Sequence, residues 1–174
     1  MKYYSGNGDK GETGIADKKV MKNSREIVLV GALDELNAFL GYAAAKTKHD
    51  DIRDLLKKAE ERIYVISAYS TGYSSLVEKK EEDITGKDVE ELEKAMYTLS
   101  KETEDIAKFI RPNGSEAATA INICRTLARK AEREAVGSAV KNKEILAYLN
   151  RLSSMLFVLF RVENKRDGFS EEFF

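Results

Sequence analysis

Residues 143–165 read KEILAYLNRLSSMLFVLFRVENK, and this stretch decides the fold. Its large apolar residues recur at a spacing of three or four, close to a heptad: Ile145, Leu149, Leu152, Leu156 and Leu159. That spacing predicts one long helix with a continuous apolar stripe. Asn150 and Ser153 interrupt the stripe. Because Asn150 adjoins the buried seam and a buried amide needs partners, we expect it to bond a neighbouring helix or, alternatively, a ligand.

The same periodicity predicts four helices upstream of this one. The first begins after Gly31, and the second covers about 50–69. The third follows Thr85 as its N-cap, and the fourth follows Ser115 and ends near residue 136. Residues 26–30 are apolar and fit either a strand or the lead-in to the first helix, whereas residues 71–83 are typical of a connecting loop.

Short connections between helices of this length favour an antiparallel, up-down arrangement. We therefore predict an all-α fold, a five-helix bundle of ferritin-like arrangement over residues 32–166. A Gly-rich loop over residues 1–25 precedes it, and residues 1–174 form one domain. The single proline, Pro112, agrees with a mostly helical chain.

The composition argues against several classes of function. The 174 residues carry a formal charge of −1 with 34% charged residues, which argues against a nucleic-acid partner. We see no apolar run long enough to cross a bilayer and no signal peptide, and the single Cys124 excludes an intramolecular disulfide, so we expect a cytoplasmic protein. One His and one Cys argue against a His/Cys metal site and remove the usual base for Ser or Cys nucleophilic catalysis.

Residues 6–14 read GNGDKGETG, with four glycines and a lysine in nine residues. Exposed backbone N–H groups beside a lysine form a cradle for phosphate oxygens, although a frayed terminus would fit the same composition. Gly6, Gly8 and Gly11 satisfy G-x-G-x-x-G, but too few residues precede them for a strand, and no βαβ pattern follows. The Walker pattern fails as well, because Ser or Thr does not follow a Gly-Lys pair. A nucleotide bound here would need another fold.

A row of arginines lies on the fourth predicted helix, where Arg125, Arg129 and Arg133 recur every four residues. The row is either a solvated face with ion pairs, for example between Glu132 and Arg129, or a clamp for phosphate oxygens. Asp34 and Glu35 fall near the predicted start of the first helix, where the helix dipole alone would account for acids. His49 lies at a helix junction and is expected on the surface.

Five segments in order resemble the cob(I)alamin adenosyltransferases of the propanediol-utilisation type. They are NGDKGETG at 7–14, GALDELN at 31–37, FIRPNG at 109–114, CRTLARKAER at 124–133 and LNRLS at 149–153. The family's corresponding patterns are T-G-D-x-G-x-T, G-x-x-D-E-L-N, F-I-L-P-G-G, C-R-x-x-x-R-R-A-E-R and L-N-R-L-S. Each segment alone is weak, but five in family order across nearly the whole chain are specific.

The resemblance implies a homotrimer of five-helix bundles that binds ATP, with Mg²⁺, and cobalamin at subunit interfaces. The implied reaction is the attack of cobalt(I) on the 5′-carbon of ATP with release of triphosphate, which makes adenosylcobalamin. Because the cofactor's own metal is the nucleophile, the protein needs no Ser, Cys or His nucleophile. Its implied partners are a corrinoid reductase and an adenosylcobalamin-dependent enzyme, without nucleic acid or membrane.

The resemblance also implies roles for single residues. Asp34 and Arg125 would form a salt bridge across the subunit interface, and Phe109 would lie beneath the corrin and exclude the lower axial ligand. Arg129 would act on the nucleotide in catalysis. The triphosphate would contact the loop residues and the lysine after them: Ser5, Gly6, Asn7, Gly8, Lys10, Thr13, Gly14 and Lys22. Further nucleotide contacts would come from Arg129, Lys130, Glu132, Arg133 and Asn150. No residue is assigned to a metal.

Five residues replace the commoner residues of the family pattern: Asn7, Arg111, Asn113, Lys130 and Ser154. Arg111, Asn113 and Ser154 leave the detail of the corrinoid pocket undecided, whereas Asn7 and Lys130 change the nucleotide segments, by loss of a hydroxyl and of a guanidinium fork. The alternative function is a non-catalytic bundle that binds nucleotide and corrinoid, as a regulator or a cofactor chaperone. A ferritin-like di-metal bundle would need E-x-x-H pairs, and no Glu precedes His49 at that spacing.

Overall fold

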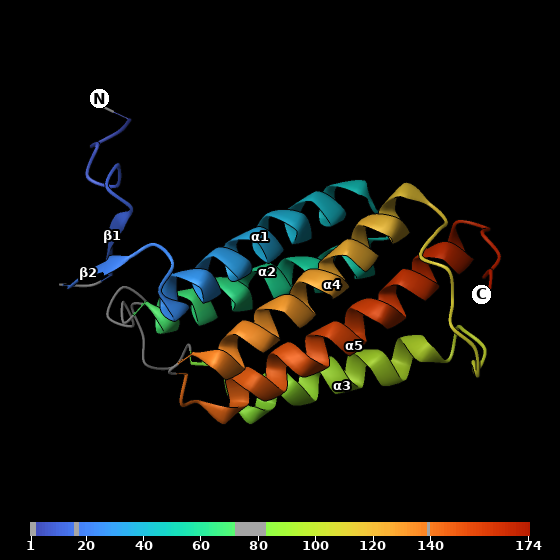
Figure 1. Cartoon of the computed structure of the whole chain (residues 1–174). Coiled ribbons are helices and arrows are strands. Elements are labelled where there is room, and N and C mark those ends of the chain that lie inside the picture. Colours follow the sequence, from blue (N-terminus) through green and yellow to red (C-terminus); the bar gives the residue numbers. More distant parts are fainter. Residues whose placement is uncertain (1–2, 16–17, 72–82, 139) are drawn as a thin grey trace.

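The structure is a computed structural model that describes residues 3–15, 18–71, 83–138 and 140–174. Five helices make up most of the described chain (Figure 1): α1 (Arg25–Lys46), α2 (Asp50–Ser70), α3 (Gly86–Ser100), α4 (Glu116–Gly137) and α5 (Lys143–Arg166). Two short strands, β1 (Glu12–Ile15) and β2 (Lys18–Met21), precede them. The prediction of an all-α, five-helix fold is confirmed.

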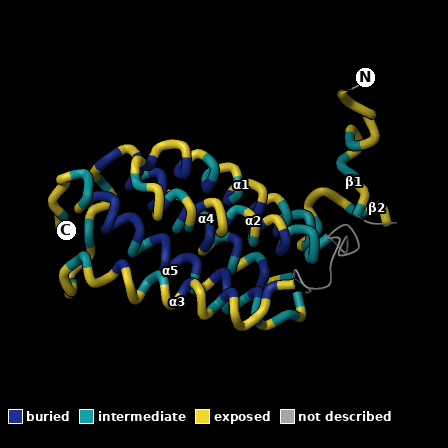
Figure 2. The backbone as a smooth tube through the Cα atoms, turned by 180° about the vertical axis from the view of Figure 1, so that it is seen from behind, coloured by how far each residue is buried: buried dark blue, intermediate teal, exposed yellow. Residues whose placement is uncertain are grey.

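The helices alternate in direction along the chain and pack around α5 and α1 (Figure 1). Helix α4 contacts both α1 and α5, while α2 covers α1 and α3 covers α5. Since α3 and α5 run in the same direction, that one contact is parallel, whereas the other pairs are antiparallel as predicted. Buried residues follow the inner faces of all five helices (Figure 2). The predicted stripe of α5 is fully buried, with Ile145 1% exposed and the four leucines 0%.

Four of the five helix starts agree with the prediction, and two of these helices, α3 and α4, begin at the capping residues predicted from the sequence. The Ser115 hydroxyl accepts a hydrogen bond from the backbone N–H of Ala118 at 3.1 Å and begins α4. At the start of α3, the Asp88 carboxylate accepts from the backbone N–H of Thr85 at 2.7 Å. Of the predicted 71–83 loop, residues 72–82 lie outside the described residues.

The predicted start of the first helix was wrong by about two turns. Helix α1 begins at Arg25, so the apolar run 26–30 is its first part and not a strand. Leu29 is fully buried one turn before Leu33, which continues the same face. Gly31 interrupts the pattern in sequence only, since it lies inside the helix, and a Cβ placed on it would meet no atom within 4 Å.

The segment before α1 was predicted as loop only, yet it contains a hairpin. Strands β1 and β2 pair antiparallel, with Glu12 opposite Met21 and Ile15 opposite Lys18. The hairpin projects from the end of the bundle where α1 begins (Figure 1). It presents the glycine-rich residues 6–11 beyond the helices.

Two helices, α1 and α5, are long and apolar enough to span a membrane by length and composition. The expectation that no stretch would meet this criterion was therefore wrong. In the bundle, the apolar stripes of both helices are buried against the other helices, with Leu36 and Leu156 each 0% exposed. We interpret both as core helices, whose burial requires the same composition.

Candidate functional site

The glycine-rich loop is held by its own backbone. Gly6 and Gly11 adopt positive φ angles of 72° and 78°, which glycine reaches without strain. The N–H of Asp9 donates to the carbonyl of Gly6 at 3.2 Å, and the N–H of Gly11 to that of Gly8 at 3.1 Å. These two successive turns leave the side chains of Lys10 and Asn7 exposed. The loop is therefore a defined structure and not a frayed end.

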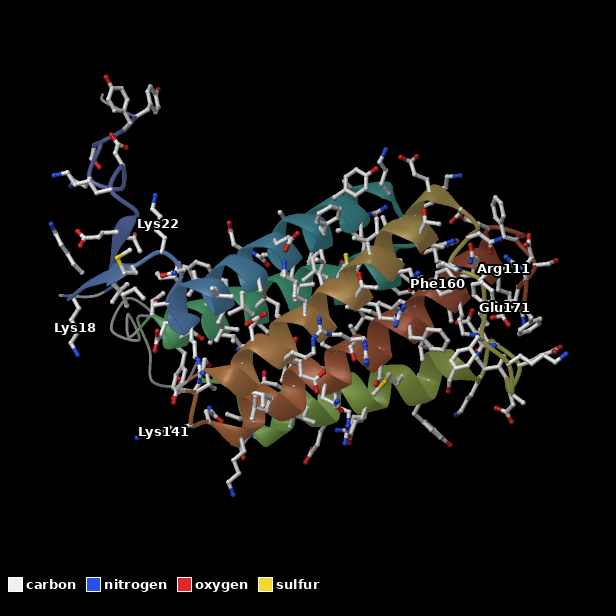
Figure 3. All side chains as sticks on the ribbon, viewed as in Figure 1. Lys18, Lys22, Arg111, Lys141, Phe160 and Glu171 are labelled. Atoms are coloured by element: carbon white, nitrogen blue, oxygen red, sulfur yellow. The ribbon has the colours of Figure 1, made fainter. Side chains whose placement is uncertain are left out.

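Lys22 folds back over this loop. A Cβ placed on Gly8 would lie 2.9 Å from the Lys22 ammonium nitrogen, so the tip of the lysine lies directly against the loop backbone there. The N–H of Lys22 also donates to the carbonyl of Gly11 at 2.8 Å. Figure 3 shows Lys22 beside the hairpin, at the N-terminal end of the bundle. Lys22 of the basic run thus lies against the loop, and Ser5, Thr13 and Gly14 lie along the same segment. Their contacts with a triphosphate stay a prediction.

Of the three arginines in the row on α4, one makes a hydrogen bond to a neighbouring side chain, and two make no ion pair with the described residues. Arg125 is half-buried, donates from Nε to Asn122 Oδ1 at 2.7 Å, and lies 6.0 Å from the ring centre of Phe157. Burial, with the nearby charge of Arg129, lowers the pKa of Arg125 from its ordinary value. Arg129 and Arg133 are exposed and have no ion pair with any residue that the structure describes. An ion-paired solvated face would have engaged these guanidinium groups.

Around the row, three predicted nucleotide residues bond across helices. The Asn150 amide of α5 donates to Glu132 of α4 at 2.9 Å, so the neighbouring-helix partner is confirmed, although Asn150 is exposed and not buried. Glu132 therefore meets Asn150, whereas the pair with Arg129 is absent among the described contacts. The Lys130 ammonium bonds the Glu35 carboxylate at 2.5 Å and joins α4 to α1.

Asp34 needs a new explanation. Because α1 begins at Arg25, Asp34 lies more than two turns from the helix start, beyond the reach of the helix dipole. Its carboxylate is exposed, and it makes no ion pair with Arg125 within the described part of one protomer. An unpaired acid on a helix face fits the predicted bond to a second protomer, which stays a prediction.

Phe109 lies at the other end of the bundle, between α3 and α4, and is 87% exposed. The C-terminal tail pairs with this segment through an antiparallel bridge between Ile110 and Phe173. The N–H of Phe174 donates to the carbonyl of Phe109 at 3.1 Å. Sequence reasoning missed the bridge, since no local pattern signals a pairing across such a separation. A large exposed aromatic on a fixed backbone is suited to contact a flat apolar ligand.

Arg111, which replaces the commoner residue of the family pattern, contacts the C-terminal tail. Its Nε donates to the carbonyl of Phe173 at 3.1 Å, and its guanidinium lies 4.6 Å from the ring centre of Phe174. A second arginine, Arg161 of α5, is buried and binds Glu171 of the tail at 2.6 Å. Figure 3 shows Arg111 and Glu171 close together at this end. The tail is thus fastened at two points next to Phe109.

The turn after Pro112 depends on a glycine. Gly114 has a φ of 128°, and a Cβ placed there would lie 1.9 Å from Asn164 Oδ1. The buried Asn164 amide accepts from the N–H of Ser115 at 2.9 Å and donates to the carbonyl of Asn113 at 2.9 Å. This amide joins α5 to the Phe109 segment and the start of α4.

Gly114→Ala is therefore expected to lower the free energy of unfolding by about 3 kcal/mol, because it adds backbone strain and a clash with Asn164. Chemical denaturation followed by circular dichroism measures the change. Gly137→Ala is the matched control, since nothing lies within 4 Å of a Cβ at Gly137 and helical alanine is favoured by up to about 1 kcal/mol. Equal stabilities of the two variants would contradict this account of Gly114.

Cys124 and His49 were not assigned to the site from the sequence, and the structure agrees with the expectation for only one of them. Burial raises the pKa of the Cys124 thiol to about 12, so this side chain is not a nucleophile at neutral pH, as expected. His49 is not a free surface residue as predicted. It is half-buried, and its Nε2 lies 3.5 Å from Asp167 Oδ1.

The site residues form two groups that one protomer does not bring together. The loop and the hairpin lie beyond the start of α1, whereas the segment between α3 and α4, which contains Phe109, lies at the opposite end of the bundle (Figure 1). Helix α5 alone, with 24 residues, separates these ends by roughly 36 Å. The α4 residues lie between the two groups, on an exposed face.

Comparison with known proteins agrees with these motifs. A family model described as cobalamin adenosyltransferase matches residues 3–163. A corrinoid adenosyltransferase of Bacillus subtilis is 34% identical over 176 aligned positions, which cover 98% of this chain and 91% of the relative. The corrinoid adenosyltransferase PduO of Salmonella typhimurium is 32% identical over 94% of this chain, which spans only 50% of that relative.

Solved structures agree on the fold. A PduO-type ATP:corrinoid adenosyltransferase from Lactobacillus reuteri, solved as a phenylalanine-to-histidine variant with cobalamin and ATP, superposes with a TM-score of 0.89. It is 24% identical, and the match covers 99% of this chain and 96% of that one. Because the family model and the relatives span nearly the whole chain, including all five motifs, the chain belongs to the cobalamin adenosyltransferase family.

Proposed function

We propose that this chain transfers the 5′-deoxyadenosyl group of ATP to the cobalt of cob(I)alamin. A carbon–cobalt bond forms as the bond between the 5′-carbon and its phosphate oxygen breaks, and triphosphate leaves with the electron pair of that bond. The observation that carries the proposal is the pair of unengaged, exposed guanidinium groups of Arg129 and Arg133, within a family whose members are adenosyltransferases. An exposed, unpaired cation is available to an anionic ligand.

The protein's own chemical task is electrostatic. Negative charge grows on the triphosphate as the bond to the 5′-carbon breaks, and preorganised donors stabilise that charge most in the transition state. The turns at Gly6 and Gly8 and the ammonium of Lys22 supply donors on the loop. Arg129 and Arg133 supply fixed forks on α4. Mg²⁺ would bind largely through phosphate oxygens and water, because the loop offers only the dispersed carboxylates of Asp9 and Glu12.

Phe109 would form the floor of the corrin site. Its ring is 87% exposed on a backbone held by the C-terminal tail, so it can cover the lower face of the corrin without moving. An aromatic ring in this place excludes a lower axial ligand. Without that donor, cobalt(II) would accept an electron more readily from the reductase that the proposal assumes, which would give the cobalt(I) nucleophile. Arg111 would act indirectly, by fastening the tail.

We further propose that the chain works as a homotrimer, whose subunits complete one another's sites. Support comes from the separation of the two site groups and from the outer face of α1. That face exposes mostly small or apolar residues, namely Val28, Gly31, Ala38, Tyr42 and Ala45. A face of this composition beside an unpaired Asp34 is typical of a surface that another subunit covers. The Arg125 guanidinium would then be the partner of Asp34 across the interface.

Three expectations accompany this proposal. The chain acts as one domain over residues 1–174, with the loop of 1–25 as its nucleotide-binding part. It works in the cytoplasm. It receives reduced corrinoid from a reductase and delivers the product to an adenosylcobalamin-dependent enzyme.

The test is a spectroscopic assay. The protein is mixed anaerobically with ATP, Mg²⁺ and chemically reduced cob(I)alamin, and the absorbance of the corrinoid is followed. We expect enzyme-dependent growth of the adenosylcobalamin spectrum with release of one triphosphate for each product. ATP and corrinoid binding without turnover would instead favour the regulator or chaperone function. Absence of ATP binding would overturn the assignment of the loop.

A further inference from the structure

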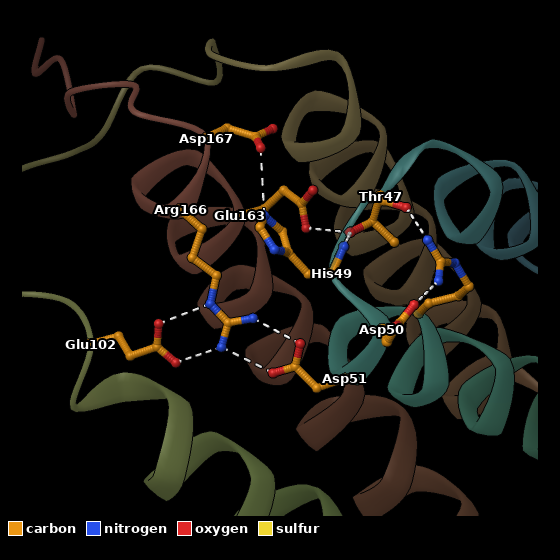
Figure 4. A network of polar contacts seen from close by, with 9 residues as sticks. Thr47, His49, Asp50, Asp51, Glu102, Glu163, Arg166 and Asp167 are labelled. Atoms are coloured by element: carbon orange, nitrogen blue, oxygen red, sulfur yellow. Dashed lines mark hydrogen bonds and ion pairs between the residues drawn. The ribbon is translucent and has the colours of Figure 1, made fainter.

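A polar cluster lies where the turn between α1 and α2 meets the C-terminal end of α5 (Figure 4). It contains His49, Glu163 and Asp167, each of which offers one ligand atom, and these atoms all lie within 4.8 Å of one another. Glu163 is 0% exposed. None of these residues belongs to the nucleotide or corrinoid groups described above.

The hydrogen bonds available in the cluster leave two buried atoms without partners. Glu163 Oε2 accepts from the Thr47 hydroxyl at 2.7 Å, but Glu163 Oε1 has no hydrogen-bond partner among the described residues. His49 Nε2 is likewise buried and unpartnered. Since buried polar atoms are almost always satisfied in native proteins, two orphans facing one cluster indicate that something binds between them.

The distance between His49 Nε2 and Asp167 Oδ1 is 3.5 Å, which is too long for a good hydrogen bond. Two ligands of one tetrahedral ion, each about 2.1 Å from it, lie about 3.4 Å apart. The observed separation therefore suits two ligands of a common metal ion better than a direct bond. Glu163 Oε1 supplies the third donor.

The charge around the cluster also calls for a cation. The network around the cluster (Figure 4) contains the carboxylates of Asp50, Asp51, Glu102, Glu163 and Asp167 and the guanidinium groups of Arg53 and Arg166. One of these, Arg166, is already shared between Asp51 at 2.8 Å and Glu102 at 2.7 Å. Arg53 is paired with Asp50. Neither Glu163 nor Asp167 forms an ion pair with an arginine or lysine among the described residues, and the histidine lies 3.5 Å from Asp167.

We propose that His49, Glu163 and Asp167 bind one divalent transition-metal ion such as Zn²⁺. One imidazole nitrogen and two carboxylate oxygens are donors that Zn²⁺ takes in proteins, and the fourth position would hold water. The charge of the ion balances the two carboxylates. The side chains of His49 and Asp167 are 24% and 17% exposed, which leaves an entry path.

The neighbours of the site support this role. Thr47 holds one oxygen of Glu163, and its own hydroxyl accepts from the N–H of His49 at 3.2 Å, so a single side chain orients two of the three ligands. The ion would tie the α1–α2 turn to the end of α5 from which the tail departs toward Phe109. Its expected role is structural, and it is independent of ATP binding.

The test uses chelator-treated full-length protein and Zn²⁺ alone. We expect one Zn²⁺ for each chain by titration calorimetry, and a rise in Tm of about 5–10 °C at a hundredfold excess over Kd. Co²⁺ in place of Zn²⁺ should give visible absorption bands typical of a low-coordinate site. Both responses should be lost in Glu163→Gln and retained in Glu102→Gln, which removes a carboxylate of the same network outside the three ligands.

Glu163→Gln could fold differently, because its side chain is fully buried; His49→Gln, at a half-buried position, is the second variant and should lose the Zn²⁺ response as well. The proposal is overturned if wild-type protein shows neither calorimetric heat nor a rise in Tm with Zn²⁺. It is equally overturned if both ligand variants respond as the wild type does, since the ion would then bind elsewhere on the surface.

Discussion

Replacing Arg129 by alanine is expected to lower kcat for adenosyl transfer by about 100- to 1000-fold, the usual effect of removing one donor from a developing anion. The free energy of unfolding should change little. Arg129 is exposed and makes no ion pair with the described residues, and such surface changes stay within about 0.5 kcal/mol. For a chain of this size, that corresponds to a change in Tm within about 2 °C.

Anaerobic turnover of cob(I)alamin and thermal unfolding are measured on the same preparations. Arg129→Lys keeps the charge but loses the planar fork, so we expect an intermediate rate. Lys57→Ala, which removes an exposed cation from α2, is the matched control and should match the wild type in both measurements. A parallel loss of rate and of Tm in Arg129→Ala would show that the side chain supports the fold, and the clamp would have to be abandoned.

The bundle could be predicted from the sequence because its signals are local. The N-caps Thr85 and Ser115 and the apolar stripe of α5 each lie within one element, and the structure confirms them. The start of α1 could not be predicted in the same way. The β-branched residues before Gly31 favour a strand, and Gly31 itself favours the end or the start of a helix. Burial of Leu29 against the other helices overrides both local preferences.

The site was less predictable, for a physical reason. Sequence motifs identify which residues belong to it, but they do not show which side chains meet. The bond between Glu132 and Asn150, the bond between Lys130 and Glu35, and the bridge from Phe173 to Ile110 all join distant segments. The unassigned cluster around Glu163 shows the same limit, because its three ligand residues come from two separate stretches of chain.

The proposed homotrimer predicts that two inactive variants recover activity when they are mixed. Lys22→Ala removes the ammonium over Gly8, and Arg129→Ala removes the fork on α4, so each variant alone should retain about 1% of wild-type turnover or less. If one subunit supplies the loop and its neighbour supplies α4, a mixed trimer contains sites built from the two intact halves. In such a site the Arg129→Ala subunit contributes the loop, in which Lys22 is intact. The Lys22→Ala subunit contributes α4, in which Arg129 is intact.

In every cyclic trimer that contains both variants, one of the three sites joins the two intact halves, so about a third of the sites should be intact. Co-expression with two different affinity tags, followed by two purification steps, isolates mixed trimers for the anaerobic assay. The matched control mixes Arg129→Ala with Arg133→Ala. Both changes lie on α4, so every site then contains a damaged helix, and no recovery is expected.

The comparison of these two mixtures separates the possible origins of the site. Recovery in the first mixture only means that a loop and a helix from different chains act together, as the proposed homotrimer requires. Doubly tagged assemblies that stay inactive in both mixtures would place the loop and α4 of one chain in the same site. The exposed face of α1 around Asp34 would then require another partner. Exposed apolar faces of this kind usually mark a surface that binds another molecule.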